Sequence, residues 1–137
     1  MPGPLEKPSP RPNPDTRPFW DFCNQHQLRF QKCLACGCVR WPPSILCPEC
    51  YGKNAEWILS NGRGKVYTYA VYRQAFHPAF ADDLPYVTAV IALDEGPHFL
   101  SNIVGCDPDE VCCDMPVELV WEDVQGGFSL PKFRPVF

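Results

Sequence analysis

Four cysteines form two identical short motifs in the first half of the chain. Cys33 and Cys36 enclose two residues, and so do Cys47 and Cys50. Each C-x-x-C turn folds back so that both sulfurs face one point, and two such turns complete the tetrahedral Cys₄ site of a structural zinc ion. Gly37, directly after the first pair, permits the positive φ with which backbone N–H groups point at the thiolates. The spacing predicts one structural zinc ion.

The cluster has three other interpretations. Iron or an iron–sulfur centre could use the same four sulfurs, although zinc is the usual metal of such paired motifs. Cys38 could replace Cys36 as a ligand, but this would break the two-residue gap. A catalytic zinc ion is not expected, because four thiolate ligands leave no coordination position for water or substrate.

The remaining five cysteines have no ligand spacing, and we expect them to be ordinary thiols. A nucleophilic cysteine needs a neighbouring base, and no motif connects a cysteine with any of the three histidines. The sequence therefore predicts no catalytic residue and no activity for the chain alone. The cysteines are Cys23, Cys38, Cys106, Cys112 and Cys113, and the histidines are His26, His77 and His98.

Composition places the chain among ordinary globular proteins. Its 137 residues are 45% hydrophobic and 20% charged, which suits one modest domain or two very small ones that share a core. The formal net charge is -4 and no basic stripe is present, so nucleic-acid binding is not expected. No segment has the ~18 consecutive apolar residues of a membrane span, and residues 1–15 lack the apolar core of a signal peptide. Nine cysteines fit a reducing compartment, so we expect a cytoplasmic protein.

The chain divides into four segments by composition. Residues 1–16 are rich in proline and predict an extended tail. Residues 17–32 contain a short amphipathic helix, expected over 17–26, and a lead-in to the cysteine motifs. Residues 33–57 form the zinc ribbon, and residues 58–137 form a small β-barrel. The helix is too short to be stable alone and must dock, either on the chain's own core or on a partner subunit.

The barrel follows from at least five short apolar or β-branched runs that turn residues separate. Asp94 to Pro97 and Gly126-Gly127 are the clearest turns. So many strands leave no room for helical crossovers, and the sequence predicts a mainly β fold. The segment between residues 74 and 86, which contains His77, is either a lid or a plain connecting loop. The strands are expected over residues 64–76, 86–93, 99–104, 117–121 and 129–137.

Six motifs occur in a fixed order: Phe19-Trp20, Cys33-x-x-Cys36-Gly37, Pro42-Pro43, Cys47-Pro48-x-Cys50, Ser60-Asn61-Gly62-Arg63-Gly64-Lys65-Val66-Tyr67 and Leu130-Pro131-x-Phe133-Arg134-Pro135. In this order and spacing they resemble the acyl-CoA-associated family that joins a rubredoxin-like zinc ribbon to an OB-fold. The resemblance runs from about residue 17 to the end of the chain. One departure is Cys113, which lies in a turn where the family tends to carry glycine.

The resemblance implies a role in acyl-CoA metabolism. Members of this family are generally non-catalytic partner subunits of a thiolase-like enzyme, a related aldolase or a hydratase. By this resemblance the chain is expected to be the accessory subunit of a hetero-oligomer that acts on an acyl-CoA with an aromatic or steroid acyl group. The expected interface comprises the apolar helix, the ribbon and the C-terminal segment, with Phe19, Trp20, Phe22, Phe133 and Arg134 as anchors.

Two other functions were weighed. A stand-alone acyl-CoA-binding module would use Arg63, Lys65 and Arg73 as contacts to CoA phosphates, although these residues could equally be ordinary solvated charges. A single-stranded nucleic-acid module would stack bases on Tyr67, Tyr69 and Tyr72. The acidic net charge argues against the second function, and tyrosines in strands are more often packing residues.

Overall fold

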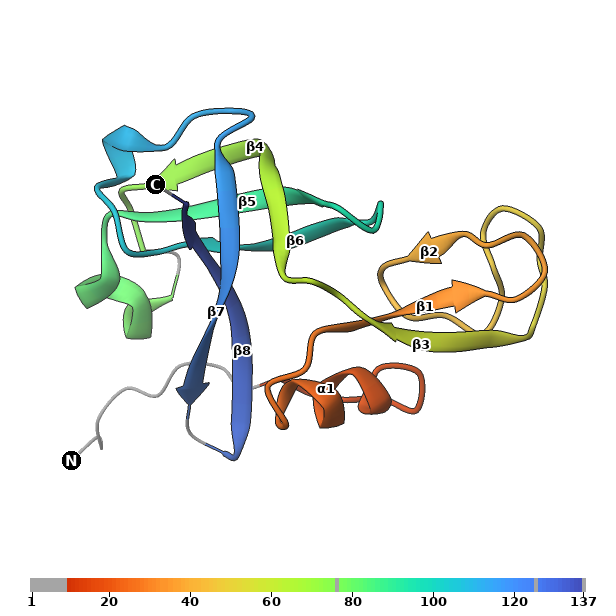
Figure 1. The fold of residues 1–137 in the computed structure, drawn as a ribbon. Helices are drawn as coiled ribbons and strands as arrows, with labels where there is room; N and C mark the ends of the chain where they lie inside the picture. The colour runs from red at the N-terminus through yellow and green to blue at the C-terminus, as the bar shows by residue number, and fades with distance from the viewer. Residues whose placement is uncertain (1–9, 76, 125, 137) are drawn as a thin grey trace.

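The computed structural model of the chain describes residues 10–75, 77–124 and 126–136. In Figure 1 a five-stranded barrel lies on the left, a small three-stranded sheet lies on the right, and one short helix lies below and between them. The mainly β fold with a short N-terminal helix, a ribbon and a barrel is the one that the sequence predicts. Of the expected tail, residues 1–9 lie outside the described residues.

The helix, α1 (Arg17–Cys23), is shorter than expected. Pro18 lies in its first turn, where the missing N–H group is not needed. The helix was expected to reach residue 26, but His26 has a φ of 57°, which lies in the left-handed region and ends the helical geometry. Asn24 at the C-cap donates its N–H to Trp20 O. The chain then turns and enters the first strand.

The ribbon sheet contains β1 (Arg29–Cys33), β2 (Val39–Arg40) and β3 (Ala55–Leu59). β1 is the central strand and pairs antiparallel with both neighbours. The first cysteine motif begins at Cys33, the last residue of β1, and the second lies in the loop between β2 and β3. The expected segment boundary after residue 57 falls within β3.

The barrel closes in the order β4-β5-β6-β8-β7. All pairs are antiparallel except β6 with β8, which are parallel and meet at Ile103 and Phe133. Each expected strand is present, and β5 has the predicted bounds. The strand β4 was expected to reach residue 76 but ends at Tyr72. Phe76 itself lies outside the described residues. The strands are β4 (Arg63–Tyr72), β5 (Tyr86–Leu93), β6 (His98–Ile103), β7 (Pro116–Val124) and β8 (Phe128–Pro135).

Turn residues match the places where the strands reverse. Between β5 and β6, Gly96 has a φ of 115° and donates its N–H to Leu93 O, so the predicted hairpin turn is confirmed. Gly126 and Gly127, with φ of 83° and 79°, lie between β7 and β8. In the turn after Cys113, Asp114 takes a φ of 66°, so an aspartate takes up the left-handed conformation there.

Two 3₁₀ helices lie in the longer loops of the barrel. η1 (Pro78–Asp83) occupies the segment between β4 and β5, and the N–H of Ala79 donates to His77 Nδ1 at its start. η2 (Pro108–Glu110) follows β6, and the Asp107 carboxylate accepts the N–H of Asp109. His77 therefore caps a loop helix.

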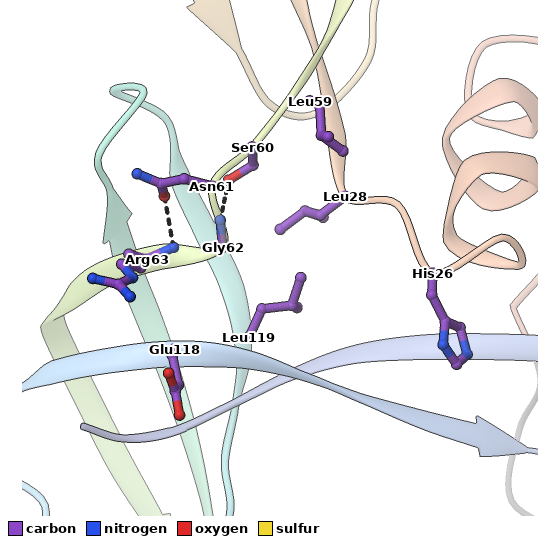
Figure 2. A pocket seen from close by; sticks show the side chains of 9 residues that line it. All are labelled: His26, Leu28, Leu59, Ser60, Asn61, Gly62, Arg63, Glu118 and Leu119. Atoms are coloured by element: carbon purple, nitrogen blue, oxygen red, sulfur yellow. Dashed lines mark hydrogen bonds between the residues drawn. The ribbon is translucent and has the colours of Figure 1, made fainter. Parts of the chain in front are cut away.

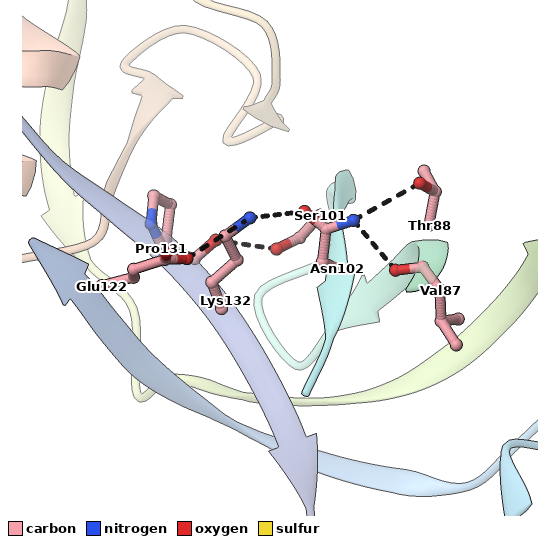
Figure 3. A network of polar contacts seen from close by, with 7 residues as sticks. All are labelled: Val87, Thr88, Ser101, Asn102, Glu122, Pro131 and Lys132. Atoms are coloured by element: carbon pink, nitrogen blue, oxygen red, sulfur yellow. Dashed lines mark hydrogen bonds and ion pairs between the residues drawn. The ribbon is translucent and has the colours of Figure 1, made fainter. Parts of the chain in front are cut away.

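The parallel junction of the barrel needs side chains to complete it. Main-chain pairing between β6 and β8 is confined to one end, and a polar network bridges the strands beyond it (Figure 3). Ser101 donates its hydroxyl to Pro131 O at 2.7 Å, and Lys132 donates to Asn102 Oδ1 at 2.5 Å. Asn102 in turn donates to Val87 O at 2.9 Å. These bonds supply cross-strand hydrogen bonding where the ladder ends.

One continuous core joins the three parts of the molecule. Phe19 from α1 packs against Trp41 at 4.4 Å between ring centroids, and Trp41 packs against Phe99 of the barrel at 4.8 Å. Phe30 of β1 lies 5.8 Å from the same Phe99 ring. Because aromatic pairs of this kind bury large apolar areas, the helix and the ribbon are held against the barrel by a shared aromatic cluster.

Candidate metal centre and its surroundings

The four sulfurs of the two C-x-x-C motifs converge on one point. All four Sγ atoms lie within 4.8 Å of one another. Cys33 Sγ lies 3.5 Å from Cys50 Sγ, and Cys36 Sγ lies 3.6 Å from Cys47 Sγ, so each close pair draws one sulfur from each motif. Four sulfurs at ~2.3 Å from a zinc ion are about 3.8 Å apart in a tetrahedron. The arrangement has room for one tetrahedral zinc ion.

Backbone geometry repeats in the two motifs. Gly37 donates its N–H to Cys33 O, and Tyr51, at the same position in the second motif, donates to Cys47 O, both at 2.9 Å. Both residues have positive φ, 79° for Gly37 and 61° for Tyr51. Left-handed backbone is unfavourable for a residue with a Cβ, but Tyr51 adopts it in the second motif as Gly37 does in the first.

Gly52 leaves space for the sulfurs. A Cβ at this position would lie 3.2 Å from Cys50 Sγ and 3.5 Å from Cys33 Sγ. The smallest residue therefore lies where the two motifs approach each other most closely, and a larger one would press on two ligand atoms. This fit is a property of the chain itself and supports the metal site.

Electrostatics at the site also favour a bound cation. N–H groups of Cys36 and then of Ala35 lower the pKa of Cys33 to about 6. N–H groups of Cys50 and Glu49, acting against burial, lower the pKa of Cys47 as well. At Cys36 the Cys38 N–H also lowers the pKa, but burial and the nearby sulfurs outweigh this effect. They raise the pKa of Cys36 to about 12. Four thiolates at this spacing repel one another, and a divalent cation removes that repulsion.

The other cysteines stand apart from the cluster. The converging set contains Cys36 and excludes Cys38, whose Sγ lies 3.8 Å from Val39 O. Burial raises the pKa of Cys23 to about 12. Burial, with the carboxylates of Glu110 and Asp107, also raises the pKa of Cys106. These environments suppress thiolate formation and so disfavour nucleophilic chemistry.

The histidines do not meet a cysteine within the described residues. His26 Nε2 lies 2.9 Å from Asp123 Oδ1, and Ser129 donates its hydroxyl to the same Oδ1 at 2.5 Å. The carboxylate therefore lies between the hydroxyl and the imidazole, whereas a catalytic triad needs the imidazole in the middle. His98 lies against Tyr67, with 4.5 Å between ring centroids.

The residues expected at a partner interface lie at different depths. Phe19 and Phe133 are 1% and 0% exposed, so their side chains belong to the core. Trp20 is half-buried against Phe19 and Phe128, at 5.3 Å and 5.9 Å between ring centroids. Phe22 is half-buried against Trp57 at 5.5 Å. Arg134 is exposed and pairs with Glu118 at 2.8 Å.

The three basic residues considered for CoA do not converge. Arg63 lines a pocket of about 370 Å³ where the ribbon meets the barrel (Figure 2). Lys65 lies two residues along β4 and is exposed. Arg73 follows the other end of β4, about 25 Å further along at the usual rise per residue, and pairs with Asp109 at 3.1 Å. Only Arg63 and Lys65 can contact one ligand together.

Patterns of two domain families match successive parts of the chain. Residues 20–56 match the one described as ChsH2, rubredoxin-like zinc ribbon domain, and residues 57–122 match ChsH2, C-terminal OB-fold domain. The chain belongs to the ChsH2 family. The ribbon match and the four converging sulfurs show a site for one structural zinc ion, as the cysteine spacing predicts.

Relatives of this ChsH2-family chain include subunits of several enzymes. It is 37% identical over 129 residues to a probable enoyl-CoA hydratase alpha subunit from Thermomonospora curvata. The aligned region covers 94% of this chain and 40% of that protein. It is 38% identical over 102 residues to a DUF35 domain-containing scaffold protein from Methanothermobacter thermautotrophicus, covering 74% of this chain and 76% of that one. Benzoylsuccinyl-CoA thiolase subunit BbsA from Thauera aromatica is 29% identical over 92 residues, covering 67% of this chain and 61% of that subunit.

A solved structure has the same architecture. The Ltp2-ChsH2(DUF35) aldolase is similar with a TM-score of 0.85 at 37% identity, over 93% of this chain and 98% of that one. This agreement covers the helix, the ribbon and the barrel together. Within the described residues, no helix has the length and apolar character needed to cross a membrane.

Sequence reasoning missed several residues of the site's surroundings. Arg40 and Gly52 have no motif that marks them, although Gly52 follows the second cysteine pair directly. Asp123 lies 97 residues from His26, so only the fold brings the two together. Glu95 was expected as part of a turn, and its bonds to the chain between ribbon and barrel were not foreseen.

Proposed function

We propose that this chain is a zinc-containing, non-catalytic accessory subunit of a thiolase-type enzyme, or of a related aldolase or hydratase, that acts on acyl-CoA thioesters. The observation that carries the proposal is the surface around the zinc site. Four large apolar side chains are exposed there: Leu34 by 60%, Ile45 by 67%, Leu46 by 42% and Tyr51 by 75%.

These side chains are ill suited to solvent and well suited to an interface. Leu34 follows Cys33 directly, Leu46 precedes Cys47 and Tyr51 follows Cys50, so the metal site fixes their backbone positions. A rigid apolar surface loses little conformational entropy on binding and removes apolar area from water. Grouped exposed apolar residues of this kind are typical of docking surfaces. We call Leu34, Ile45, Leu46 and Tyr51 the ribbon tip.

The chemistry of the site supports an accessory role over a catalytic one. Four protein sulfurs fill the coordination sphere of the zinc ion, so the metal has no position at which to activate water or a carbonyl group. Within the described residues, no cysteine thiol is hydrogen-bonded to a histidine. The relatives include a subunit of a hydratase and a subunit of a thiolase, and a similar solved structure is an aldolase that contains ChsH2. These names support assembly of this chain with an enzyme of one of these three types.

Three further expectations belong to this proposal: the wider interface, the kind of acyl group and the cellular compartment. Trp20, Phe22 and Arg134 would extend the interface from the ribbon tip along α1 and β8, since each keeps some exposed surface. The acyl group would be bulky, aromatic or steroidal. The nine cysteines, all unpaired by disulfides, support work in the cytoplasm, where thiols stay reduced.

Direct contact with CoA is a second candidate function. Arg63 lines the junction pocket, and its guanidinium forms no ion pair with another described residue. A free guanidinium at a pocket suits a phosphate group. Lys65 on the same strand face would add a second positive charge.

Co-expression with a thiolase-, an aldolase- and a hydratase-type enzyme, one at a time, tests the main proposal. We expect the two chains to elute together in size-exclusion chromatography, and acyl-CoA turnover to require both. The variant Ile45→Asp/Tyr51→Asp should weaken the complex by about 2 kcal/mol or more, because it places two charges in an apolar interface.

Tyr67→Asp is the matched control, because Tyr67 is similarly exposed, at 59%, but lies on the barrel. It should leave complex formation unchanged. The proposal fails if the chain stays monomeric with all three enzyme types, or if the chain alone turns over an acyl-CoA.

A further inference from the structure

One buried side chain in the ribbon keeps a hydrogen-bonding group without a partner. Arg40 on β2 is 5% exposed. Its Nε donates to Gln31 Oε1 at 3.1 Å and its Nη2 donates to Ser44 O at 3.0 Å, but Nη1 has no partner. Across residues 10–75, 77–124 and 126–136, Nη1 is the one buried side-chain nitrogen or oxygen atom in this condition.

The guanidinium also forms no direct ion pair, since none of the ion pairs among the described residues includes Arg40. Removing a guanidinium from water without supplying an anion is unfavourable, and buried charges in proteins are almost always paired. Gln31 and Ser44 supply neutral oxygens only, so they hold the side chain in place without neutralising it.

Arg40 lines a pocket of about 260 Å³ between the ribbon and the segment that leads into α1. Lys53 adds a second positive charge to the pocket lining, and Asp15 adds one negative charge. Pro18 and Trp57 contribute apolar walls. In a chain whose formal net charge is -4, two cations against one anion make this pocket locally positive.

We propose that the Arg40 pocket is a binding site for a carboxylate group. The carboxylate would accept a hydrogen bond from Arg40 Nη1 and a second one from Lys53, which supplies the missing partner and the missing charge. Asp15 at the same pocket repels a second negative charge, so a monoanionic carboxylate is preferred to a phosphate dianion. The apolar walls receive the carbon stem of the acid.

This inference does not depend on the proposed function. A free small acid and an acidic side chain of another protein share the same chemistry, and the experiment separates them. Nη1 is covered in the free chain, so a hydrogen bond to the carboxylate requires the side chains that cover this atom to reposition.

The test is an NMR titration of the zinc-loaded full chain with ¹⁵N-labelled arginine and tryptophan. The probes are acetate, the blocked amino acid N-acetyl-glutamate methylamide, and inorganic phosphate at neutral pH. We expect both carboxylates to shift the Arg40 Nε and Trp57 indole signals saturably, with phosphate binding more weakly than either. Tighter binding of acetate would identify a free acid as the ligand, and tighter binding of the blocked glutamate would identify an acidic side chain; both support the site.

Three variants test whether the pocket residues bind the carboxylate. Arg40→Gln should abolish the shift of the Trp57 signal, but this change also removes bonds that position the loop. Lys53→Met leaves the fold intact, because Lys53 is exposed, and should weaken carboxylate binding by about threefold to fivefold. Lys32→Met, an exposed lysine of β1 outside the pocket, should change nothing.

Three results would overturn the proposal. The first is the absence of a saturable shift up to about 100 mM carboxylate, which would mean that water satisfies Nη1. The second is equal weakening by Lys53→Met and Lys32→Met. The third is tighter binding of phosphate than of both carboxylates, which would contradict the assigned ligand class.

Discussion

His26 and Asp123 are hydrogen-bonded at 2.9 Å although 97 residues separate them. The imidazole also stacks on Trp121, with 5.2 Å between ring centroids and 7° between ring planes. His26 follows α1, and both Asp123 and Trp121 lie on β7. The pair therefore ties the end of the helix to the barrel.

This pair predicts a pH dependence of stability. The Ser129 hydroxyl, and after it His26, lowers the pKa of Asp123 below its ordinary value. A carboxyl group whose pKa is lower in the folded state contributes stability above its unfolded pKa, and loses it as the pH falls through the folded value. The difference in urea midpoint between the wild type and Asp123→Asn should be full at neutral pH and shrink below about pH 4.

Asp21→Asn is the control for this series, because Asp21 is exposed on α1 and its carboxylate forms no hydrogen bond or ion pair with another described residue. The difference in urea midpoint between Asp21→Asn and the wild type should stay near zero at every pH. A constant difference for Asp123→Asn across the whole range would show that the carboxylate does not contribute through its charge.

Replacement of one zinc ligand should remove the metal. Elemental analysis of the purified wild type should return about one equivalent of zinc per chain. Cys47→Ser should lose the metal and unfold the ribbon, because the metal replaces a core that this segment is too small to build. Cys106→Ser, which alters a half-buried thiol outside the cluster, should keep full zinc content. Full zinc in Cys47→Ser, or iron in place of zinc in the wild type, would contradict the site.

Particular residues show what the sequence could and could not predict. The cysteine ligands were predictable because C-x-x-C spacing is a local property of the chain. The strand β5 was predictable because it is an apolar and β-branched run that turn residues bound. The end of α1 was not, since it depends on the left-handed conformation of His26. The short length of the helix indicated that it must dock, but only the packed structure shows that Phe19 is buried in the core. The burial of Arg40 was not predictable either, because the pairing of β2 with β1 brings Gln31 beside it.

The helix should contribute to stability through Trp20. This side chain packs on Phe19 and on Phe128 of β8, so Trp20→Ala should lower the free energy of unfolding by roughly 2 kcal/mol. Leu34→Ala, at a side chain that is 60% exposed, should change it by less than about 0.5 kcal/mol. Chemical denaturation measures both. Unchanged stability of Trp20→Ala together with a weakened enzyme complex would instead make Trp20 an interface anchor.

Glu95 should hold the ribbon and the barrel in a fixed relation. Its carboxylate accepts the Ser60 hydroxyl at 2.7 Å and the Asn61 N–H at 2.9 Å, so the β5–β6 hairpin turn is tied to the chain that joins β3 to β4. Hydrogen bonds to a charged acceptor contribute about 1.5–3 kcal/mol, so Glu95→Ala should accelerate hydrogen exchange at the Asn61 amide by about tenfold or more. Amides of β1 should keep their protection, because the change acts on the link and leaves the ribbon sheet paired. Glu110→Ala, an exposed residue of η2, is the control and should leave Asn61 unchanged. Equal exchange of Asn61 in the wild type and in Glu95→Ala would show that the hairpin does not restrain the link.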